Sequence, residues 1–400
     1  MLINADFHIH SRFSGGTSEK MTIRNLSTES KKKGIHLLAT GDCLHSQWLK
    51  EIKENGEYND GLFEVNGVTF VLSTEVEDER RVHHLILFPC LDAIEEFKHH
   101  ILKHSQNIQT DGRPHIFLSG GEILDLAMEV DAMAGPSHAF TPWTSLYAYY
   151  DSIKDCYGDR HVSFLELGLS ADSNYADRIR ELHKIPFLSN SDSHSPYPIR
   201  LAREFNRLEV EEITWDEIKK AILFRGGRKI VFNAGFPPEE GKYNKTACIK
   251  CYAHYTLEEA KEKKWKCNCG GRIKKGVRDR IDELADYEVA KHPEFRPPYI
   301  HIIPLAEIIA KALNLSSFSK TVTKRWEELM RAFGDEISVL LDVGIGEIKK
   351  ITAPAIAYAI EAFRNGKIKI HPGGGGKYGE IKIIYEEKKE EQRRLVDWIN

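Results

Sequence analysis

The chain has 400 residues, of which 41% are hydrophobic, 29% charged and 10% aromatic, and its formal net charge is −4. This length allows two or three domains, and the low net charge excludes a whole-molecule positive field, so any nucleic-acid binding must come from a local patch. No apolar run approaches 18 residues and Met1–Ile3 lead directly into the first motif, so we expect neither a membrane span nor a signal peptide.

The first 235 residues alternate between short apolar runs and amphipathic stretches. This alternation predicts an α/β domain over residues 1–235, with a parallel sheet or barrel. The expected strands are Leu2–His8, His36–Thr40, Thr69–Thr74, His83–Phe88, Ala132–Pro136, Ser163–Leu167, Pro186–Ser189 and Lys229–Phe232. The expected helices between them include Ile23–Lys33, Gly121–Val130, Ala176–His183 and Trp215–Arg225.

The pattern changes after a linker-like stretch at Asn233–Tyr243. Residues 244–275 form a compact cysteine module, and residues 276–400 are expected to be a mainly helical DNA-binding region with a charged tail at Glu386–Asn400 that forms a terminal helix. Helical periodicity is clear in Leu305–Leu313 and Trp326–Phe333.

Two glycine motifs lie in this last region. Gly344-Ile-Gly346 resembles the turn of helix–hairpin–helix DNA-binding motifs, and Gly373–Gly376 lacks the spacing of a phosphate-binding P-loop, so we expect a flexible loop there.

Histidines and carboxylates recur at the ends of the expected strands in the first domain. Strand alternation places His8 and His10 on one face, two residues apart. Buried imidazoles are costly when unpaired but are good ligands for a divalent metal. The other members of the set are Asp42, Glu75, His84, His138, Asp192 and His194. Their positions after strands predict a metal-dependent hydrolase with its site at the carboxyl face of the strands.

Two further histidines stay open as ligands. His45 follows Asp42 closely, and a structural role for it is as plausible as a ligand role. His83 precedes His84, and alternation points the two to opposite faces of the strand, so one of them should face the site.

As an ordered set, these motifs resemble the PHP (polymerase and histidinol phosphatase) superfamily of metal-dependent phosphoesterases. The resemblance rests on His-x-His at His8 and His10, on Thr-x-Asp at Thr40–Asp42, and on Asp-x-His at Asp192 and His194, with Glu75, His84 and His138 between them. It implies a distorted seven-stranded β/α barrel. In one departure, the superfamily's second motif has adjacent Asp and His ligands, whereas Asp42 and His45 are separated here.

The resemblance also implies up to three divalent metals, Zn²⁺, Mn²⁺, Mg²⁺ or Fe²⁺, at the barrel face. One would be held by His8, His10, Glu75 and Asp192, a second by Glu75, His84 and His138, and a third by Asp42 and His194. Such a cluster activates water for phosphodiester hydrolysis, so Asp192, Glu75 and His194 are the expected catalytic residues. Ser11 and Arg12 follow the first motif and either contact the phosphate or belong to an ordinary polar loop.

Four of the seven cysteines form two close pairs in the second region. Cys248 and Cys251 are followed by Cys267 and Cys269, and this spacing predicts a tetrahedral structural zinc site. His254 is a candidate substitute ligand. Cysteines clustered in this way favour a reducing cytoplasm over a disulfide framework.

The same region is strongly basic. Residues 241–280 carry twelve Lys/Arg and four Asp/Glu, a net charge of +8, with Tyr243, Tyr252, Tyr255 and Trp265 among them. Concentrated positive charge with aromatic side chains favours a nucleic-acid surface, and the alternative is a solvated basic face.

The order of barrel, zinc module and helical region is similar to the endonuclease Q family of DNA-repair nucleases. The resemblance rests further on the segments Pro136–Trp143 and Leu167–Asp172. It implies cleavage on the 5′ side of uracil, hypoxanthine, xanthine or an abasic site. Such an enzyme takes the lesion out of the base stack, and the candidate pocket residues are Phe140, Ser170 and Asn190.

Two other functions fit parts of the pattern. A small-molecule phosphatase would use the same barrel, but it has no evident need for a basic zinc module. A non-catalytic DNA-binding protein would not need a nearly complete ligand set. We therefore expect damaged DNA as the partner of a monomeric enzyme, with no membrane contact and no sequence motif to support binding to a sliding clamp.

Overall fold

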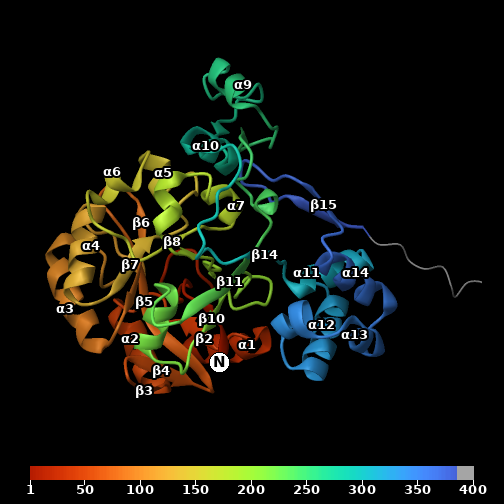
Figure 1. The fold of residues 1–400 in the computed structure, drawn as a ribbon, viewed down its shortest axis with the longest axis horizontal. Helices are drawn as coiled ribbons and strands as arrows, with labels where there is room; N and C mark the ends of the chain where they lie inside the picture. The colour runs from red at the N-terminus through yellow and green to blue at the C-terminus, as the bar shows by residue number, and fades with distance from the viewer. Residues whose placement is uncertain (385–400) are drawn as a thin grey trace, which may run out of the picture. The chain divides into compact units, whose positions relative to one another are not determined.

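The computed structural model describes residues 1–384, which divide into two compact units (Figure 1). The barrel unit comprises Met1–Ile303 together with His371–Glu380, and the helical unit comprises Pro304–Ile370 with residues 381–384. The helix predicted for Glu386–Asn400 lies outside the described residues. Within residues 1–384, no helix is long and apolar enough to cross a membrane.

Seven strands build the predicted barrel. They are β1 (Leu2–Asp6), β2 (Leu37–Ala39), β5 (Val68–Glu77), β6 (His83–Phe88), β7 (Met133–Pro136), β8 (Leu165–Glu166) and β9 (Phe187–Leu188). The Ser163 amide donates to the Ala134 carbonyl between β7 and β8, and a bridge from Ile9 to Ser193 returns the sheet to β1. Strand β6 runs antiparallel to both β5 and β7, so the expectation of a wholly parallel sheet is wrong there.

Further strands extend the sheet on either side of the barrel. The antiparallel strands β10 (Phe205–Glu209) and β11 (Lys229–Gly235) follow β1, and β14 (Tyr299–His301) pairs with β11. On the other side, β3 (Glu57–Asn59) and β4 (Leu62–Val65) form a hairpin on β5. Strand β14 joins this sheet, and residues 276–303 fall within the barrel unit, whereas the helical unit begins at Pro304.

Helices surround the barrel strands, and Figure 1 shows α3, α4 and α6 outside β5 to β7. The helices of the barrel domain are α1 (Ile23–Lys33), α2 (Ser46–Asn55), α3 (Leu91–Ile101), α4 (Gly120–Glu129), α5 (Leu146–Tyr149), α6 (Ile153–Tyr157), α7 (Ser173–Ala176) and α8 (Trp215–Ile222). Helix α1 has its predicted bounds because Thr22 caps its first turn and Gly34 adopts a left-handed φ of 86° at its end.

The helix predicted at Ala176–His183 is wrong. Helix α7 ends at Ala176, and a short 3₁₀ helix follows at Arg180–Lys184. The carboxylate of Asp177 turns inward to the buried Arg296, 3.0 Å away, and this ion pair takes the chain out of the helical path.

The zinc module is a small hairpin with one helix. Strands β12 (Ala247–Cys248) and β13 (Ile273–Lys274) pair antiparallel, α9 (Leu257–Glu262) lies between them in sequence, and α10 (Val277–Leu284) follows. The glycine run packs on this module, since Gly374 bridges to Lys245 and a Cβ on Gly375 would lie 2.4 Å from the Cys248 carbonyl oxygen. The expectation of a flexible loop is therefore wrong, because glycine is needed for close backbone approach.

The helical unit contains α11 (Leu305–Leu313), α12 (Lys320–Phe333), α13 (Ile345–Ile351) and α14 (Pro354–Arg364). The strands β15 (Ile368–His371) and β16 (Glu380–Ile383) pair as a two-stranded ribbon, and all of its residues except His371 and Glu380 belong to this unit. The predicted helix Leu305–Leu313 is confirmed. Gly344 and Gly346 are exposed at the start of α13, as expected for a hairpin turn.

Candidate metal centre

Two buried histidines after β1 have the same arrangement of partners. His8 Nδ1 lies 2.9 Å from a Glu166 carboxylate oxygen, and His10 Nδ1 lies 3.1 Å from Asp42 Oδ1. In the described part of the chain, neither His8 Nε2 nor His10 Nε2 has a hydrogen-bond partner, although both are buried. In each imidazole, Nδ1 is hydrogen-bonded to a carboxylate and Nε2 is left without a partner. Metal-ligating histidines have this arrangement.

Two carboxylates face these free nitrogens. Glu75 Oε1 lies 3.5 Å from His8 Nε2, and Glu75 Oε2 lies 3.5 Å from His10 Nε2. Asp192 Oδ1 is 3.3 Å from His10 Nε2, and its neighbour His194 has a ligand atom in the same group. The donor set of imidazole nitrogens and carboxylate oxygens fits a divalent transition metal.

The charges of this cluster depend on one another. Burial opposes charge on every member, but the neighbouring imidazolium groups hold the pKa of Glu75 and Asp192 well below the usual range. Against the same penalty, the carboxylates of Asp192 and Asp42 raise the pKa of His10 to about 9. The carboxylates thus require positive charge, and a divalent metal would supply it in place of the protons.

His83, rather than His84, belongs to the site. His83 Nδ1 lies 3.1 Å from Glu75 Oε1, and His138 Nε2 lies 3.1 Å from the same oxygen. His84 points to the other face of β6, where its nitrogens contact Asp78 and the Tyr157 hydroxyl. The assignment of His84 to the Glu75 centre is therefore corrected, and its described ligand group is instead Asp78, His84 and Cys156. The cause is register, since Glu77 pairs with His83 and residues of one parity share a face.

Replacing each histidine separately tests this correction. We expect His83→Ala to weaken metal binding in the barrel by at least about 10-fold. His84→Ala should lower the melting temperature, because Asp78 and Tyr157 lose a buried partner, while the metal content stays that of the unchanged protein. Elemental analysis and thermal unfolding of both variants check the prediction, and equal metal loss in the two would contradict it.

Asp42 lies behind His10 instead of beside His194. Its Oδ2 accepts hydrogen bonds from the Ser11 amide and hydroxyl and from the Ser14 hydroxyl, and a Cβ on Gly112 would lie 2.4 Å from it. Because both oxygens of Asp42 already have hydrogen-bond partners, its carboxylate orients His10. The prediction that Asp42 and His194 together bind a third metal is therefore corrected.

The group that includes His194 is instead His10, Asp192 and His194. His45 stacks on Phe13 with ring centroids 4.3 Å apart and does not join the described ligand groups.

Left-handed backbone recurs at the centre. Asp42, His138 and Asp192 have φ values of 48°, 30° and 45°. Such conformations are uncommon for residues with a side chain and cluster where function fixes a side-chain direction.

Glu166 was not predicted. Besides His8, it accepts hydrogen bonds from the His138 amide (2.8 Å) and from Asn190 Nδ2 (2.9 Å). Its signal in the sequence is a carboxylate within the apolar strand of Phe164–Leu167. Arg113, whose Nη1 lies 3.2 Å from Glu75 Oε2, comes from a loop without any such signal.

Loss of the Glu166 charge should reduce activity through His8. We expect Glu166→Gln to lower metal affinity and turnover about 10- to 100-fold, because an amide no longer fixes the Nδ1–H tautomer of His8. Glu181→Gln is the matched control, since Glu181 accepts from the Tyr147 hydroxyl outside the centre. Metal titration of the two variants measures the difference, and unchanged affinity in Glu166→Gln would show that His8 needs no carboxylate.

The centre opens into a cleft of about 710 Å³. Ser170 and Asn190 line it as predicted, together with Asp192 and His194. Asn190 Oδ1 accepts from the Phe7 amide and from Asn206, and Nδ2 donates to Glu166.

Three predicted contact residues lie outside the lining of this cleft. Ser11 is buried against Asp42, Arg12 pairs with Glu51 at 2.8 Å, and Phe140 stacks on Tyr147 in the core. Ser11 and Phe140 are buried against these partners, whereas Arg12 is exposed, and the assignment of all three to the DNA or base pocket stays a prediction.

The four predicted zinc cysteines come together. Cys248 Sγ lies 3.6 Å from Cys269 Sγ, and Cys251 Sγ lies 3.5 Å from Cys267 Sγ. The Tyr255 hydroxyl donates to Cys267 Sγ and lowers the pKa of this thiol to about 6, which favours the thiolate that binds zinc. His254 is not part of this described group.

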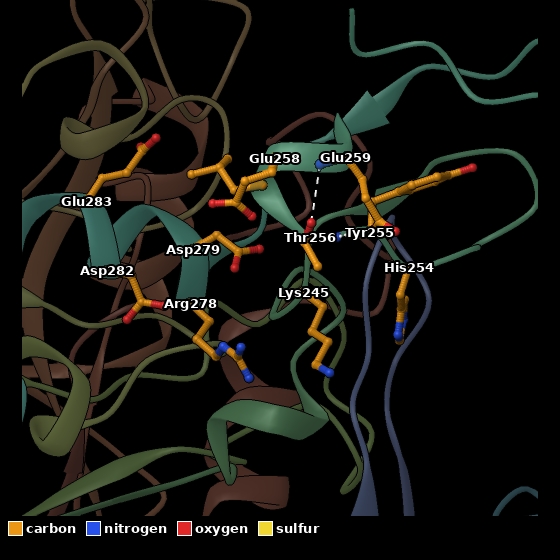
Figure 2. Close-up of a pocket in the computed structure, with 11 residues that line it drawn as sticks. Lys245, His254, Tyr255, Thr256, Glu258, Glu259, Arg278, Asp279, Asp282 and Glu283 are labelled. Atoms are coloured by element: carbon orange, nitrogen blue, oxygen red, sulfur yellow. Dashed lines mark hydrogen bonds between the residues drawn. The ribbon is translucent and has the colours of Figure 1, made fainter. Parts of the chain in front are cut away.

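A second cavity, of about 560 Å³, lies between the zinc module and α10 (Figure 2). Lys245, His254 and Arg278 line it together with the carboxylates of Glu258, Glu259, Asp279, Asp282 and Glu283. In Figure 2, Asp279 extends from α10 on one side of the cavity, and on the other side Thr256 caps α9 by accepting a hydrogen bond from the Glu259 amide. The mixture of signs makes it a poor site for a polyanion.

Comparison with known proteins gives extended matches. The crystal structure of the lesion-specific endonuclease PfuEndoQ from Pyrococcus furiosus is 52% identical, with a TM-score of 0.93 and 99% of both chains covered. A structure of endonuclease Q with a 27-mer duplex carrying an abasic lesion at the active site is also 52% identical, with a TM-score of 0.94 over 98% of this chain and 100% of that chain.

Two curated relatives are uncharacterized proteins. YqxK of Bacillus subtilis is 33% identical over 95% of this chain and 99% of its own length. MJ0043 of Methanocaldococcus jannaschii is 49% identical over 65% of this chain, and this match spans about a third of MJ0043 (34%). A family described as the MJ0043 C-terminal domain matches residues 304–367, which lie in the helical unit.

The protein therefore belongs to the class of metal-dependent endonucleases. This conclusion rests on the barrel, on its histidine–carboxylate centre and on these matches. Within that class, the chain belongs to the endonuclease Q family.

Proposed function

We propose that this chain is a DNA-repair endonuclease that hydrolyses the phosphodiester on the 5′ side of a deaminated base or an abasic site. The observation that carries the proposal is the juxtaposition of the buried, unpartnered His8 Nε2 and His10 Nε2 with Asp192, whose side chain is 31% exposed in the cleft. A site that can bind metals and is also open to solvent is accessible to the backbone of a DNA strand.

The residues of the centre have separable roles. Glu75 and Asp192 bring negative charge to the free imidazole nitrogens, and Glu166 and Asp42 orient His8 and His10. His194 Nδ1 contacts the Asp192 carbonyl oxygen at 3.1 Å, so Nδ1 carries the hydrogen and Nε2 is free to accept a proton or a metal. Burial lowers the pKa of His194, which keeps this ring neutral.

Divalent metals bound at this centre would lower the pKa of water and offset the charge of the phosphoryl group. In the hydrolysis, a water oxygen forms a bond to phosphorus, the bond from phosphorus to the upstream O3′ breaks, and that oxygen takes a proton. The products are a 3′-hydroxyl and a 5′-phosphate. Arg113, 3.2 Å from Glu75 and partly exposed, is placed to hold the phosphoryl oxygens.

Asn190 is the candidate reader of the flipped base. Asn190 lines the cleft at 1% exposure, and one of its two Nδ2 hydrogens donates to Glu166, which leaves the other for a base edge. We expect Asn190→Ala to reduce the preference for uracil over thymine, measured as the ratio of cleavage rates on matched duplexes. An unchanged ratio would remove Asn190 from lesion recognition. Ser170, at 8% exposure in the same wall, is the second candidate.

One assay separates this proposal from its alternatives. A labelled duplex with a single deoxyinosine or deoxyuridine is incubated with the protein and Mg²⁺ or Mn²⁺. A nick on the 5′ side that Asp192→Ala cannot make supports the proposal. Turnover of a phosphomonoester alone would indicate a small-molecule phosphatase, and retarded but intact DNA would indicate a non-catalytic binding protein.

The metal count and the assembly belong to the same proposal. Up to three divalent ions in the barrel and one zinc in the module give about four metals per chain, which elemental analysis of purified protein measures. A monomer and a cytoplasmic location stay predictions, and a sliding clamp stays without a supporting motif.

A further inference from the structure

Three cations surround one tyrosine at the rim of the cleft. Arg200 and Arg203 follow β9, Lys242 precedes the zinc module, and Tyr378 comes from the segment His371–Glu380. We call these four residues the Tyr378 cluster. All four line the cavity that also contains Asp192 and His194, so three distant parts of the sequence meet beside the metal centre.

The phenol holds the two arginines in place. Arg200 Nη1 and Arg203 Nη1 donate to Tyr378 Oη at 3.3 and 3.2 Å, and Lys242 Nζ lies 5.9 Å from the centre of the ring. Burial disfavours ionisation of Tyr378, yet the charges of Arg203, Lys242 and Arg200 outweigh it and lower the pKa of the phenol. The cluster is therefore a concentrated positive field.

No described residue supplies a carboxylate within ion-pair distance of Arg200, Arg203 or Lys242, although Arg203 is only 7% exposed. Elsewhere in the cleft, Arg113 pairs with Glu75 and Arg81 pairs with Glu77. The neighbouring Glu204 is a weak counter-charge because burial raises its pKa to about 8. Cations gathered without an anion are costly, so the fold keeps a place for an anionic ligand.

The cluster is tied to the metal centre through the backbone. Arg203 Nε donates to the Ser191 carbonyl oxygen at 3.1 Å, one residue before Asp192. Guanidinium groups match the oxygens of a phosphate, and a tyrosine hydroxyl also binds phosphate. A DNA strand that places its scissile bond at Asp192 would bring a neighbouring phosphate to the Tyr378 cluster.

We propose that Arg200, Arg203 and Lys242, held together by Tyr378, bind a phosphate of the DNA backbone next to the scissile one. This inference rests on the proposed endonuclease function and adds a subsite to it. The subsite positions the strand while the nucleotide is extruded, so its loss weakens substrate binding more than it slows the chemical step. It also gives the C-terminal segment His371–Glu380 a part in the substrate cleft.

Neutralising single phosphates tests the subsite. Lesion duplexes carry an uncharged methylphosphonate at one position flanking the scissile phosphate, and both fluorescence anisotropy and single-turnover cleavage are measured. For the unchanged protein, we expect one position to raise the dissociation constant about 10-fold or more. Arg200→Ala should raise the dissociation constant for unmodified lesion DNA by a similar factor. The methylphosphonate at that one position should then have no further effect on binding. The slope of log affinity against log salt should fall by about one.

Arg180→Ala is the matched control. Arg180 also donates to a tyrosine hydroxyl, that of Tyr287 at 3.0 Å, but outside the cleft. The subsite would be overturned if Arg200→Ala still responded to the methylphosphonate at every position. It would also be overturned if Arg180→Ala lost as much DNA affinity as Arg200→Ala. Absence of cleavage on all duplexes would overturn the proposed function, while the anisotropy scan would still decide the subsite. Tyr378→Phe should weaken binding at the same position, because the arginines lose their shared acceptor.

Discussion

Glu75→Gln should abolish cleavage of lesion-containing DNA, with a loss of at least about 10³-fold in single-turnover rate. The two oxygens of Glu75 each lie 3.5 Å from a free imidazole nitrogen, and Oε1 is also 3.1 Å from His83 Nδ1 and from His138 Nε2. An amide keeps the shape of this side chain but removes the charge that both candidate metal positions share. The cleavage rate and the barrel metal content should fall together.

Glu77→Gln is the control for Glu75→Gln. Glu77 lies on the same face of β5, and its Oε2 is 3.2 Å from His83 Nε2, but it does not belong to the described ligand groups. We expect its loss to reduce the rate less than about 10-fold. A Glu75→Gln protein that keeps its metals and its rate would show that the bridging position is assigned to the wrong carboxylate.

Local patterns in the sequence predict the barrel and much of its centre. Apolar strands followed by His8, His10, Asp192 and His194 place these side chains at one face, because carboxyl ends of parallel strands meet there. The zinc module could be predicted for the same reason, since the ligands are close in sequence. Thr22 and Gly34 fix the bounds of α1 through short-range capping.

Long-range register limits such prediction. His83 and His84 are equivalent in the sequence, and the pairing of β6 with β5 decides which of them reaches Glu75. Asp42 follows a strand as a ligand would, yet Ser11 and Ser14 arrive from another segment and occupy its oxygens. Arg113 and Tyr378 come from segments without regular periodicity, so their positions depend on tertiary packing.

The zinc module should lose its structure when one ligand is removed. Its buried core consists of Cys248, Ala260, Cys267 and Ile273, with Tyr255 and Trp265 packed against it. So small a core cannot offset the conformational entropy of about thirty residues, whereas structural zinc contributes roughly 10–16 kcal/mol. Two of the four core residues, Cys248 and Cys267, are also predicted zinc ligands, so we expect metal binding and packing to fail together.

We therefore expect Cys267→Ser to release one zinc per chain and to open residues 245–275 to trypsin. A serine hydroxyl stays protonated at neutral pH, whereas the Tyr255 hydroxyl favours the thiolate of Cys267. DNA affinity should fall about 10-fold or more, because the module presents much of the +8 charge of residues 241–280. Zinc content, limited proteolysis and filter binding measure these three effects.

Cys90→Ser, a cysteine outside the cluster, is the control and should change none of them. The metals of the barrel should remain in Cys267→Ser, because their ligands come from strands whose hydrogen bonds do not involve the module. Loss of barrel metals in this variant would show that the two metal sites depend on each other. Retention of zinc would mean that another side chain, such as the candidate substitute ligand His254, takes the place of the thiolate.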